Sequence, residues 1–180
     1  MPFIEIITSK ESESQLRNLI TKFLVNNCET MYIKEENIDN IKNIKLDTIV
    51  FNEKITNWNI LQKIVNNSKN VVYNLDMNTD IDKDKFLIEQ VITYGYNSKS
   101  DITISSIQDE QILICLQSTI INLQNIKIEP QEIKVNVNRE NVDIYDIMII
   151  IALAIIYAKW ENLIKNAKKS TFYVDKTKKW

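Results

Sequence analysis

Residues 70–76 read NVVYNLD, an apolar and β-branched run that ends in polar residues. Such a run, bounded by polar turn residues, is typical of a buried strand, which we expect to span Asn70–Leu75. Runs of the same kind predict four further strands: Phe3–Ile7, Thr30–Ile33, Thr48–Phe51 and Val91–Tyr94.

Helical periodicity separates these strands. After the polar segment Thr8–Ser14, apolar residues define one face of an amphipathic helix: Leu16, Leu19, Ile20, Phe23 and Leu24. The spacing of Trp58, Leu61, Ile64 and Val65 predicts a second helix, and Asp84–Gln90 a weaker helix or turn. Strands that alternate with helices indicate a parallel sheet with crossover helices.

The pattern changes after Gly95. Three further apolar runs, joined by polar connections, predict an antiparallel meander with one buried face: Ile102–Ser105, Ile112–Leu116 and Ile133–Val137. The segment Asp143–Trp160 then predicts a long helix that is apolar on nearly all sides from Ile147 onward. A helix of this kind is normally buried deep in a core.

The composition excludes several kinds of chemistry. The 180 residues include no histidine, so no imidazole can act as a base or a metal ligand. Cys28 and Cys115 are far apart and belong to no ligand cluster, so we expect buried packing roles and no metal site. The N-terminal apolar run contains Glu5 and resembles no signal peptide. The most apolar stretch, Ile147–Ala158, is shorter than the roughly 20 residues that span a bilayer, and we expect a cytoplasmic protein.

Charge is unevenly distributed along the chain. The net charge is −2, but residues 159–180 contain seven lysines against Glu161 and Asp175, which leaves the remainder acidic. Aromatic residues lie among these lysines: Trp160, Phe172, Tyr173 and Trp180. This basic aromatic tail either folds back onto the acidic body or binds a partner or an anionic surface, and we do not expect nucleic acid there. The predicted organisation is a domain at 1–158 and a tail at 159–180.

Several short motifs occur in a fixed order. They are Val71–Asp76 at a strand end, Thr93–Gly95 after the next strand, Asp101–Ser105 in the meander, and Arg139–Asn141 before the helix that contains Ala152–Ala154. Over residues 1–158 this order resembles the central, ATP-binding domain of the Mur ligase family, which includes the peptidoglycan amino-acid ligases and folylpolyglutamate synthetase. The resemblance implies an α/β fold, a three-layer P-loop or Rossmann-like parallel sheet with an antiparallel meander in its second half.

The phosphate-binding loop of that family is missing. Where the family carries G-T-x-G-K-[ST], this chain has Ser9–Ser14, which lacks glycine and places Glu13 at the lysine position, with Lys10 as the available substitute. A phosphate loop needs glycines so that successive backbone N–H groups can point at the phosphates, and the charge of Glu13 would repel them. The family's histidine after Asn52 is also missing. We therefore expect no catalytic residues and no ATP hydrolysis.

Asn74 and Asp76 are the candidate cofactor-binding residues. They lie at a strand end, where open α/β sheets bind ligands, and the resemblance places this region near a nucleotide base. The alternative is that both side chains simply end the strand through local hydrogen bonds. Gly95 is the only glycine, and we expect it to serve a backbone position with positive φ and not a phosphate.

These observations predict a non-catalytic, Mur-ligase-like binding or assembly module, a pseudo-enzyme without a cofactor. One alternative is a nucleotide-binding, ligase-related enzyme subunit with an altered phosphate site, for which ATP is the cofactor. Another is a purely structural subunit. A protein partner would bind through the helix at 147–158 or through the basic tail.

Overall fold

The structure is a computed structural model that describes residues 1–24, 28–81, 86, 88–108, 111–137, 143–159 and 172–179. In the predicted helix or turn at Asp84–Gln90, Gln90 begins β5, and residues 84, 85 and 87 lie outside the described residues. The same is true of the Arg139–Asn141 motif and of residues 160–171 and 180 of the tail.

A nine-stranded sheet forms the frame of the molecule, in the order β11-β10-β7-β6-β5-β4-β3-β1-β2. The parallel part comprises β1 Phe3–Ile7, β2 Glu29–Ile33, β3 Leu46–Phe51, β4 Ser68–Asn74 and β5 Gln90–Tyr94. The antiparallel part comprises β6 Ile102–Gln108, β7 Gln111–Leu116, β10 Gln131–Val137 and β11 Phe172–Lys179. The two parts join where β5 and β6 pair in parallel through Tyr94 and Ile102. The predicted parallel sheet with an antiparallel meander is confirmed.

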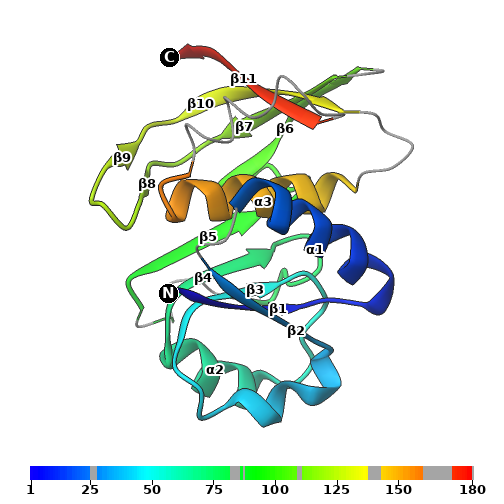
Figure 1. Cartoon of the computed structure of the whole chain (residues 1–180), viewed down its shortest axis with the longest axis vertical. Coiled ribbons are helices and arrows are strands. Elements are labelled where there is room, and N and C mark those ends of the chain that lie inside the picture. The colour runs from blue at the N-terminus through cyan, green and yellow to red at the C-terminus, as the bar shows by residue number, and fades with distance from the viewer. Residues whose placement is uncertain are drawn as a thin grey trace.

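Helices cover both faces of the parallel part (Figure 1). The helix α2, Trp58–Asn66, and the 3-10 helix η1, Glu35–Ile41, pack on one face, where the buried row Ile7, Phe51 and Tyr73 crosses three strands. The helices α1, Lys10–Leu24, and α3, Ile144–Ile156, lie on the other face. There the row Ile6, Val50, Val72 and Ile92 crosses four strands. The three-layer α/β fold is therefore confirmed.

Helix α1 begins earlier than its apolar spacing predicts. It starts at Lys10, so only Thr8 and Ser9 separate it from β1, and most of the predicted polar segment Thr8–Ser14 is helical. Ser9 acts as a capping residue, because its Oγ accepts a hydrogen bond from the Ser12 N–H at 3.4 Å. Periodicity could not reveal this start, since the first turn of α1 carries no apolar residue.

Helix α3 lies between the two parts of the sheet (Figure 1). Every residue from Asp146 to Ile156 is fully buried. The core around it combines residues of β1, β3, β4 and β5 with Ile112, Ile114, Ile133 and Val135 of the meander. A helix enclosed in this way needs no polar face, which confirms the predicted intramolecular burial. Residues 147–156 are consequently covered by the chain itself, and this part of the expected partner surface is not exposed on the folded protein.

Three features were not expected from the sequence: the 3-10 helix η1, a short ribbon and the strand β11. The ribbon, formed by β8 Ile120–Ile121 and β9 Lys127–Ile128, is inserted between β7 and β10. Within the tail, β11 pairs antiparallel with β10, so this segment extends the sheet along its edge. Among the described helices, none has the length and apolar character that crossing a bilayer would require.

We expect Ile151→Asp to yield insoluble or unfolded protein. Ile151 is fully buried at the centre of α3, and an unpaired carboxylate there would lose its hydration without compensation. Truncating a buried isoleucine already costs about 2–5 kcal/mol, a large share of the roughly 5–15 kcal/mol that stabilise a domain. Soluble yield and circular dichroism measure the outcome.

The matched control is Ile126→Asp, because Ile126 is 51% exposed on the ribbon and the same change there should leave folding intact. A soluble Ile151→Asp protein with an unchanged melting temperature would contradict the central role of α3.

Candidate functional sites at the two edges of the sheet

The strand order reverses at β1, which lies between β2 and β3, and open α/β sheets bind ligands outside the carboxyl ends of the strands at such a point. At this point Thr8 directly follows β1, and Asn52 directly follows β3. The Asn52 amide Nδ2 donates to Thr8 Oγ1 at 3.3 Å, and Asn52 Oδ1 accepts from the Tyr94 hydroxyl at 2.8 Å. Thr8 is 3% exposed and Asn52 8% exposed. The crevice between β1 and β3 is thus closed by hydrogen bonds among the protein's own side chains. A separate hollow of about 380 Å³ lies beside the carboxyl end of β2, and it is lined by Glu13, Tyr32, Ile33, Lys34, Glu36 and Asn37.

The connection between β1 and α1 is too short to wrap a phosphate. A phosphate loop is a run of several residues whose backbone N–H groups face the ligand. In this protein Thr8 and Ser9 alone form the connection, and Glu13 already lies in α1, where its Oε1 pairs with Arg17 at 2.8 Å. The stretch Ser9–Ser14, where the family resemblance would place a phosphate loop, is therefore largely helix.

Asn74, a predicted cofactor-binding residue, ends β4 and is fully buried. Its Oδ1 accepts hydrogen bonds from the backbone N–H groups of Asp76 at 3.0 Å and Met77 at 3.3 Å. The sequence left two interpretations of Asn74: it binds a ligand, or it ends the strand through local hydrogen bonds. These two hydrogen bonds are of the second kind. The Asn74 Nδ2, however, is buried without a hydrogen-bond partner among the described residues.

Asp76, the second predicted residue, occupies a small anion cradle. Its carboxylate accepts hydrogen bonds from the backbone N–H groups of Tyr96 at 2.6 Å and Asn97 at 2.8 Å, and from the Tyr145 hydroxyl at 3.1 Å. Gly95 has φ +147°, and a Cβ there would lie 2.6 Å from Asp76 Oδ2. The predicted positive φ of Gly95 is confirmed. Successive backbone N–H groups in such a turn bind anions, and here the anion is a side chain of the same protein.

Two buried carboxyl groups were not identified as site residues from the sequence. Asp146, in the first turn of α3, is fully buried, and burial, reinforced by the charge of Asp143, raises its pKa to about 7. Glu5, in strand β1, is also fully buried, and burial raises its pKa to about 8. Neither carboxyl has a hydrogen-bond partner among the described residues. The sequence signal for both is an acidic residue inside or beside an apolar run.

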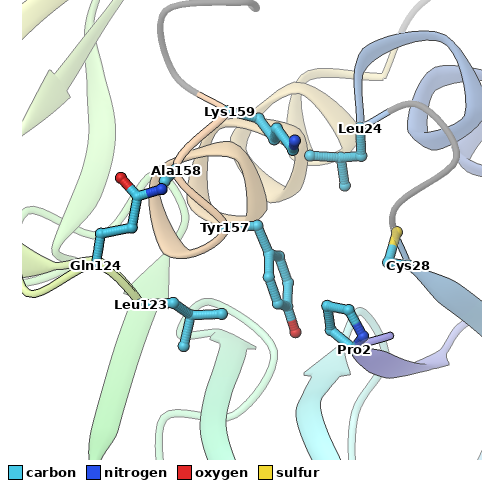
Figure 2. Close-up of a pocket in the computed structure, with 8 residues that line it drawn as sticks. All are labelled: Pro2, Leu24, Cys28, Leu123, Gln124, Tyr157, Ala158 and Lys159. Carbon is cyan, nitrogen blue, oxygen red and sulfur yellow. The ribbon is translucent and has the colours of Figure 1, made fainter.

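A cavity of about 260 Å³ lies at the opposite, amino-terminal edge of the parallel strands (Figure 2). Its walls come from the start of the chain, the two ends of the connection between α1 and β2, the ribbon and the end of α3: Pro2, Leu24, Cys28, Leu123, Gln124, Tyr157, Ala158 and Lys159. The Tyr157 hydroxyl is already engaged with Thr48 Oγ1 at 2.6 Å. No local motif marks this cavity, because its walls come from four separate segments of the chain.

The ribbon beside the cavity presents an apolar surface to solvent. Ile121, Leu123 and Ile126 are 46%, 51% and 51% exposed. The turn that carries them is held rigidly, since Asn122 Oδ1 accepts hydrogen bonds from the backbone N–H groups of Gln124 and Ile126, each at 2.9 Å. We refer to Ile121, Leu123 and Ile126 as the ribbon surface.

No protein-family model matches this chain, and no curated protein matches it. Within the described part of the chain, no group of three acidic or cysteine residues is arranged to hold a metal ion.

We expect Gly95→Ala to destabilise the protein by about 1–3 kcal/mol, because alanine would be strained at this φ and its Cβ would displace the Asp76 carboxylate. Urea denaturation measures the loss. If the contact between the added Cβ and Asp76 contributes to this loss of stability, Gly95→Ala should cost less in an Asp76→Ala background, where the facing carboxylate is absent. Equal costs in the two backgrounds would show that Asp76 does not restrict position 95.

We expect Asp146→Asn to change how stability depends on pH. The pKa of Asp146 is raised from 3.8 to about 7 in the folded protein, so the folded state keeps its proton over a pH range in which the unfolded state loses it. The free energy of unfolding should therefore fall as pH rises from about 4 to about 7. Asparagine does not titrate, so the stability of the variant relative to the natural protein should increase across this window, by about 2–4 kcal/mol in total.

Urea denaturation at intervals between pH 4 and pH 8 measures both profiles. Glu5 also makes the free energy of unfolding fall with rising pH, and it does so equally in the natural protein and in Asp146→Asn. The substitution Glu5→Gln should remove this contribution. Parallel profiles for the natural protein and Asp146→Asn would contradict the assigned titration.

Proposed function

We propose that this protein is a non-catalytic binding or assembly module, a pseudo-enzyme with the α/β architecture of a ligase core. The observation that carries this proposal is the closed crevice at the switch point, where Thr8, Asn52 and Tyr94 bond to one another. A nucleotide bound there would have to displace buried hydrogen bonds before it could make its own. The resemblance to the Mur ligase central domain and a cytoplasmic location remain predictions from the sequence.

Phosphate chemistry is disfavoured by two further features. Thr8 and Ser9 leave no loop of backbone N–H groups between β1 and α1. The anion cradle formed by the backbone N–H groups of Tyr96 and Asn97 already holds the Asp76 carboxylate, which would repel a phosphate that approached it. Both features favour a role that needs no bound nucleotide.

An assembly role is supported by the ribbon surface. Ile121, Leu123 and Ile126 expose apolar side chains on a turn that is fixed by hydrogen bonds, and exposed apolar clusters commonly mark sites of protein association. We therefore place the protein partner at the ribbon surface. The sequence predicted a partner contact through the helix at 147–158, but residues 147–156 are buried in the folded chain. The ribbon surface takes their place in this proposal.

The alternative is a nucleotide-binding subunit with an altered site, and one observation favours it. Asn74 Nδ2 and both oxygens of Asp146 are buried and unpartnered among the described residues. Asn74 ends β4 and Asp146 lies in the first turn of α3, so both lie toward the carboxyl edge of the parallel strands. A ligand that accepts from the amide and donates to the carboxyl would satisfy both groups.

Thermal unfolding with ATP and Mg²⁺ distinguishes the two roles. A ligand present at 100 times its Kd stabilises a fold by about 2.7 kcal/mol, which is a shift of several degrees in a domain of this size. We expect no shift at millimolar ATP and no ATP hydrolysis above background. Glu13→Lys should not create activity, because the glycines of a phosphate loop are absent as well. A shift that Asn74→Ala abolishes would favour the alternative, and turnover lost in Lys10→Ala would contradict the non-catalytic role.

The assembly role is tested with the double variant Leu123→Asp/Ile126→Asp. A partner that crosslinks to the natural protein in its host should no longer do so, because two carboxylates would interrupt the apolar contact. Ile107→Asp is the matched control, since Ile107 is an exposed isoleucine on β6, away from the ribbon. Crosslinking that is equal in all three proteins would show that the ribbon surface is not the contact.

A further inference from the structure

The cavity at the amino-terminal edge combines apolar walls with a single cationic side chain. Leu24 is buried at the end of α1, Leu123 extends from the ribbon, and Pro2 and the ring of Tyr157 complete the apolar lining (Figure 2). Lys159 is the only charged residue among the lining residues of the described chain. The other polar side-chain groups of the lining are the Cys28 thiol, the Gln124 amide and the Tyr157 hydroxyl, which is hydrogen-bonded to Thr48 Oγ1.

Hydrogen bonds fix the walls of this cavity. Helix α3 ends in a tight turn in which Ala158 has φ +55°, the Ala158 N–H donates to Ile155 O at 3.2 Å and the Lys159 N–H donates to Ala154 O at 2.8 Å. The ribbon is tied to the same helix end, because the Leu123 N–H donates to Ile156 O at 2.9 Å. The cavity is therefore pre-formed, which lowers the entropic cost of binding a ligand.

The charge of Lys159 is available inside the cavity. Among the described residues Lys159 forms no ion pair. Its ammonium group acts on the Cys28 thiol, where it partly opposes the rise in pKa that burial causes. Burial raises the pKa of Tyr157, and the nearby Asp47 carboxylate adds to this rise. The same carboxylate is paired with Lys69 Nζ at 2.6 Å and accepts a hydrogen bond from the Phe3 N–H at 2.9 Å. A ligand with one negative charge would thus meet a cation without a competing carboxylate from Asp47.

We propose that this cavity binds a small monocarboxylate with an apolar body. The carboxylate pairs with the Lys159 ammonium, and the body packs against Leu24, Leu123 and the ring of Tyr157. A volume of 260 Å³ corresponds to about nine waters at roughly 30 Å³ each, which suits a ligand of roughly ten non-hydrogen atoms. A phosphate ester fits less well, because one ammonium group neutralises only one charge and the other walls offer few donors.

This site does not depend on the proposed assembly role, although Leu123 belongs both to the cavity and to the ribbon surface. A medium-chain fatty acid such as octanoate has the required size and charge. For a ligand of this size we expect a Kd on the order of 0.1–1 mM.

Cys28 provides a direct reporter of occupancy. In a Cys115→Ser variant, Cys28 is the remaining cysteine, and its alkylation by iodoacetamide reports whether the cavity is open. Octanoate at a concentration of about ten times its Kd should slow this alkylation by roughly tenfold. Acetate, which lacks the apolar body, and 1-octanol, which lacks the charge, should each protect much less. Calorimetric titration of the natural protein with octanoate should give the same Kd.

Lys159→Met separates the carboxylate contact from apolar burial, because methionine keeps the stem but loses the charge. We expect the octanoate Kd to rise by roughly fivefold to tenfold in this variant, with octanol protection unchanged. Lys127→Met is the matched control, since Lys127 is exposed on β9 outside the cavity and its loss should leave the Kd unchanged.

Two results would overturn the proposal. One is alkylation of Cys28 at the same rate with and without octanoate, which would show that the cavity does not bind it. The other is equal protection by octanol and octanoate together with no effect of Lys159→Met, which would show an apolar site that does not select a carboxylate. The unfolding temperature of each variant, measured without ligand, shows whether the fold is preserved.

Discussion

Helix α3 has no polar face, and the arrangement of the whole sheet depends on this property. A helix of this kind must be covered on all sides, and a single sheet face can cover only one of them. The chain meets this requirement by placing the parallel strands on one side of α3 and the meander on the other, with α1 packed alongside (Figure 1). The nine-stranded sheet is therefore not a flat platform with a helix added to it. Its two parts are held together by a common core.

The same helix connects the two edges at which function has been considered. Its first turn brings Tyr145 to Asp76 and places Asp146 in the core near the carboxyl ends of the strands. The residues that directly follow its C-terminal end include Tyr157 and Lys159, which line the cavity at the other edge. At the carboxyl edge, where α/β sheets usually bind ligands, the crevice between β1 and β3 is closed by the protein's own side chains. The amino-terminal edge retains an open cavity with a rigid lining.

Scarcity of glycine explains much of the difference between the two edges. A phosphate loop needs several residues with unusual backbone angles, and this chain has a single glycine, Gly95. That glycine supports a cradle which the chain fills with Asp76. Elsewhere positive φ is adopted by Asn125 and Ala158, in the turns that shape the ribbon and the cavity. A phosphate loop needs unusual backbone angles to bind its ligand. In this protein the positive φ angles of Asn125 and Ala158 instead occur in turns that hold the amino-terminal edge in place.

The sequence by itself determined the order and type of most elements, because apolar periodicity is a local property of the chain. Phe3–Ile7, Thr48–Phe51, Asn70–Leu75 and the meander strands were recognisable for this reason, and so was the burial of α3. It also identified Gly95 as a special backbone position. The early start of α1 escaped prediction, because its first turn is polar and is stabilised by capping. The ribbon escaped it as well, because strands of two residues carry no readable period.

Only the tertiary structure decided what the polar residues do. Asn74 and Asp76 were found from their position after a strand, but whether they face a ligand or the protein depends on the turn at residues 95–97, which is distant in sequence. The raised pKa values of Asp146 and Glu5 arise from burial by segments that the local sequence does not specify. The cavity unites four segments whose contact is set by how the sheet encloses α3. Secondary structure follows from short-range patterns, whereas a site is a property of long-range packing, and a single sequence carries little information about which distant residues will meet.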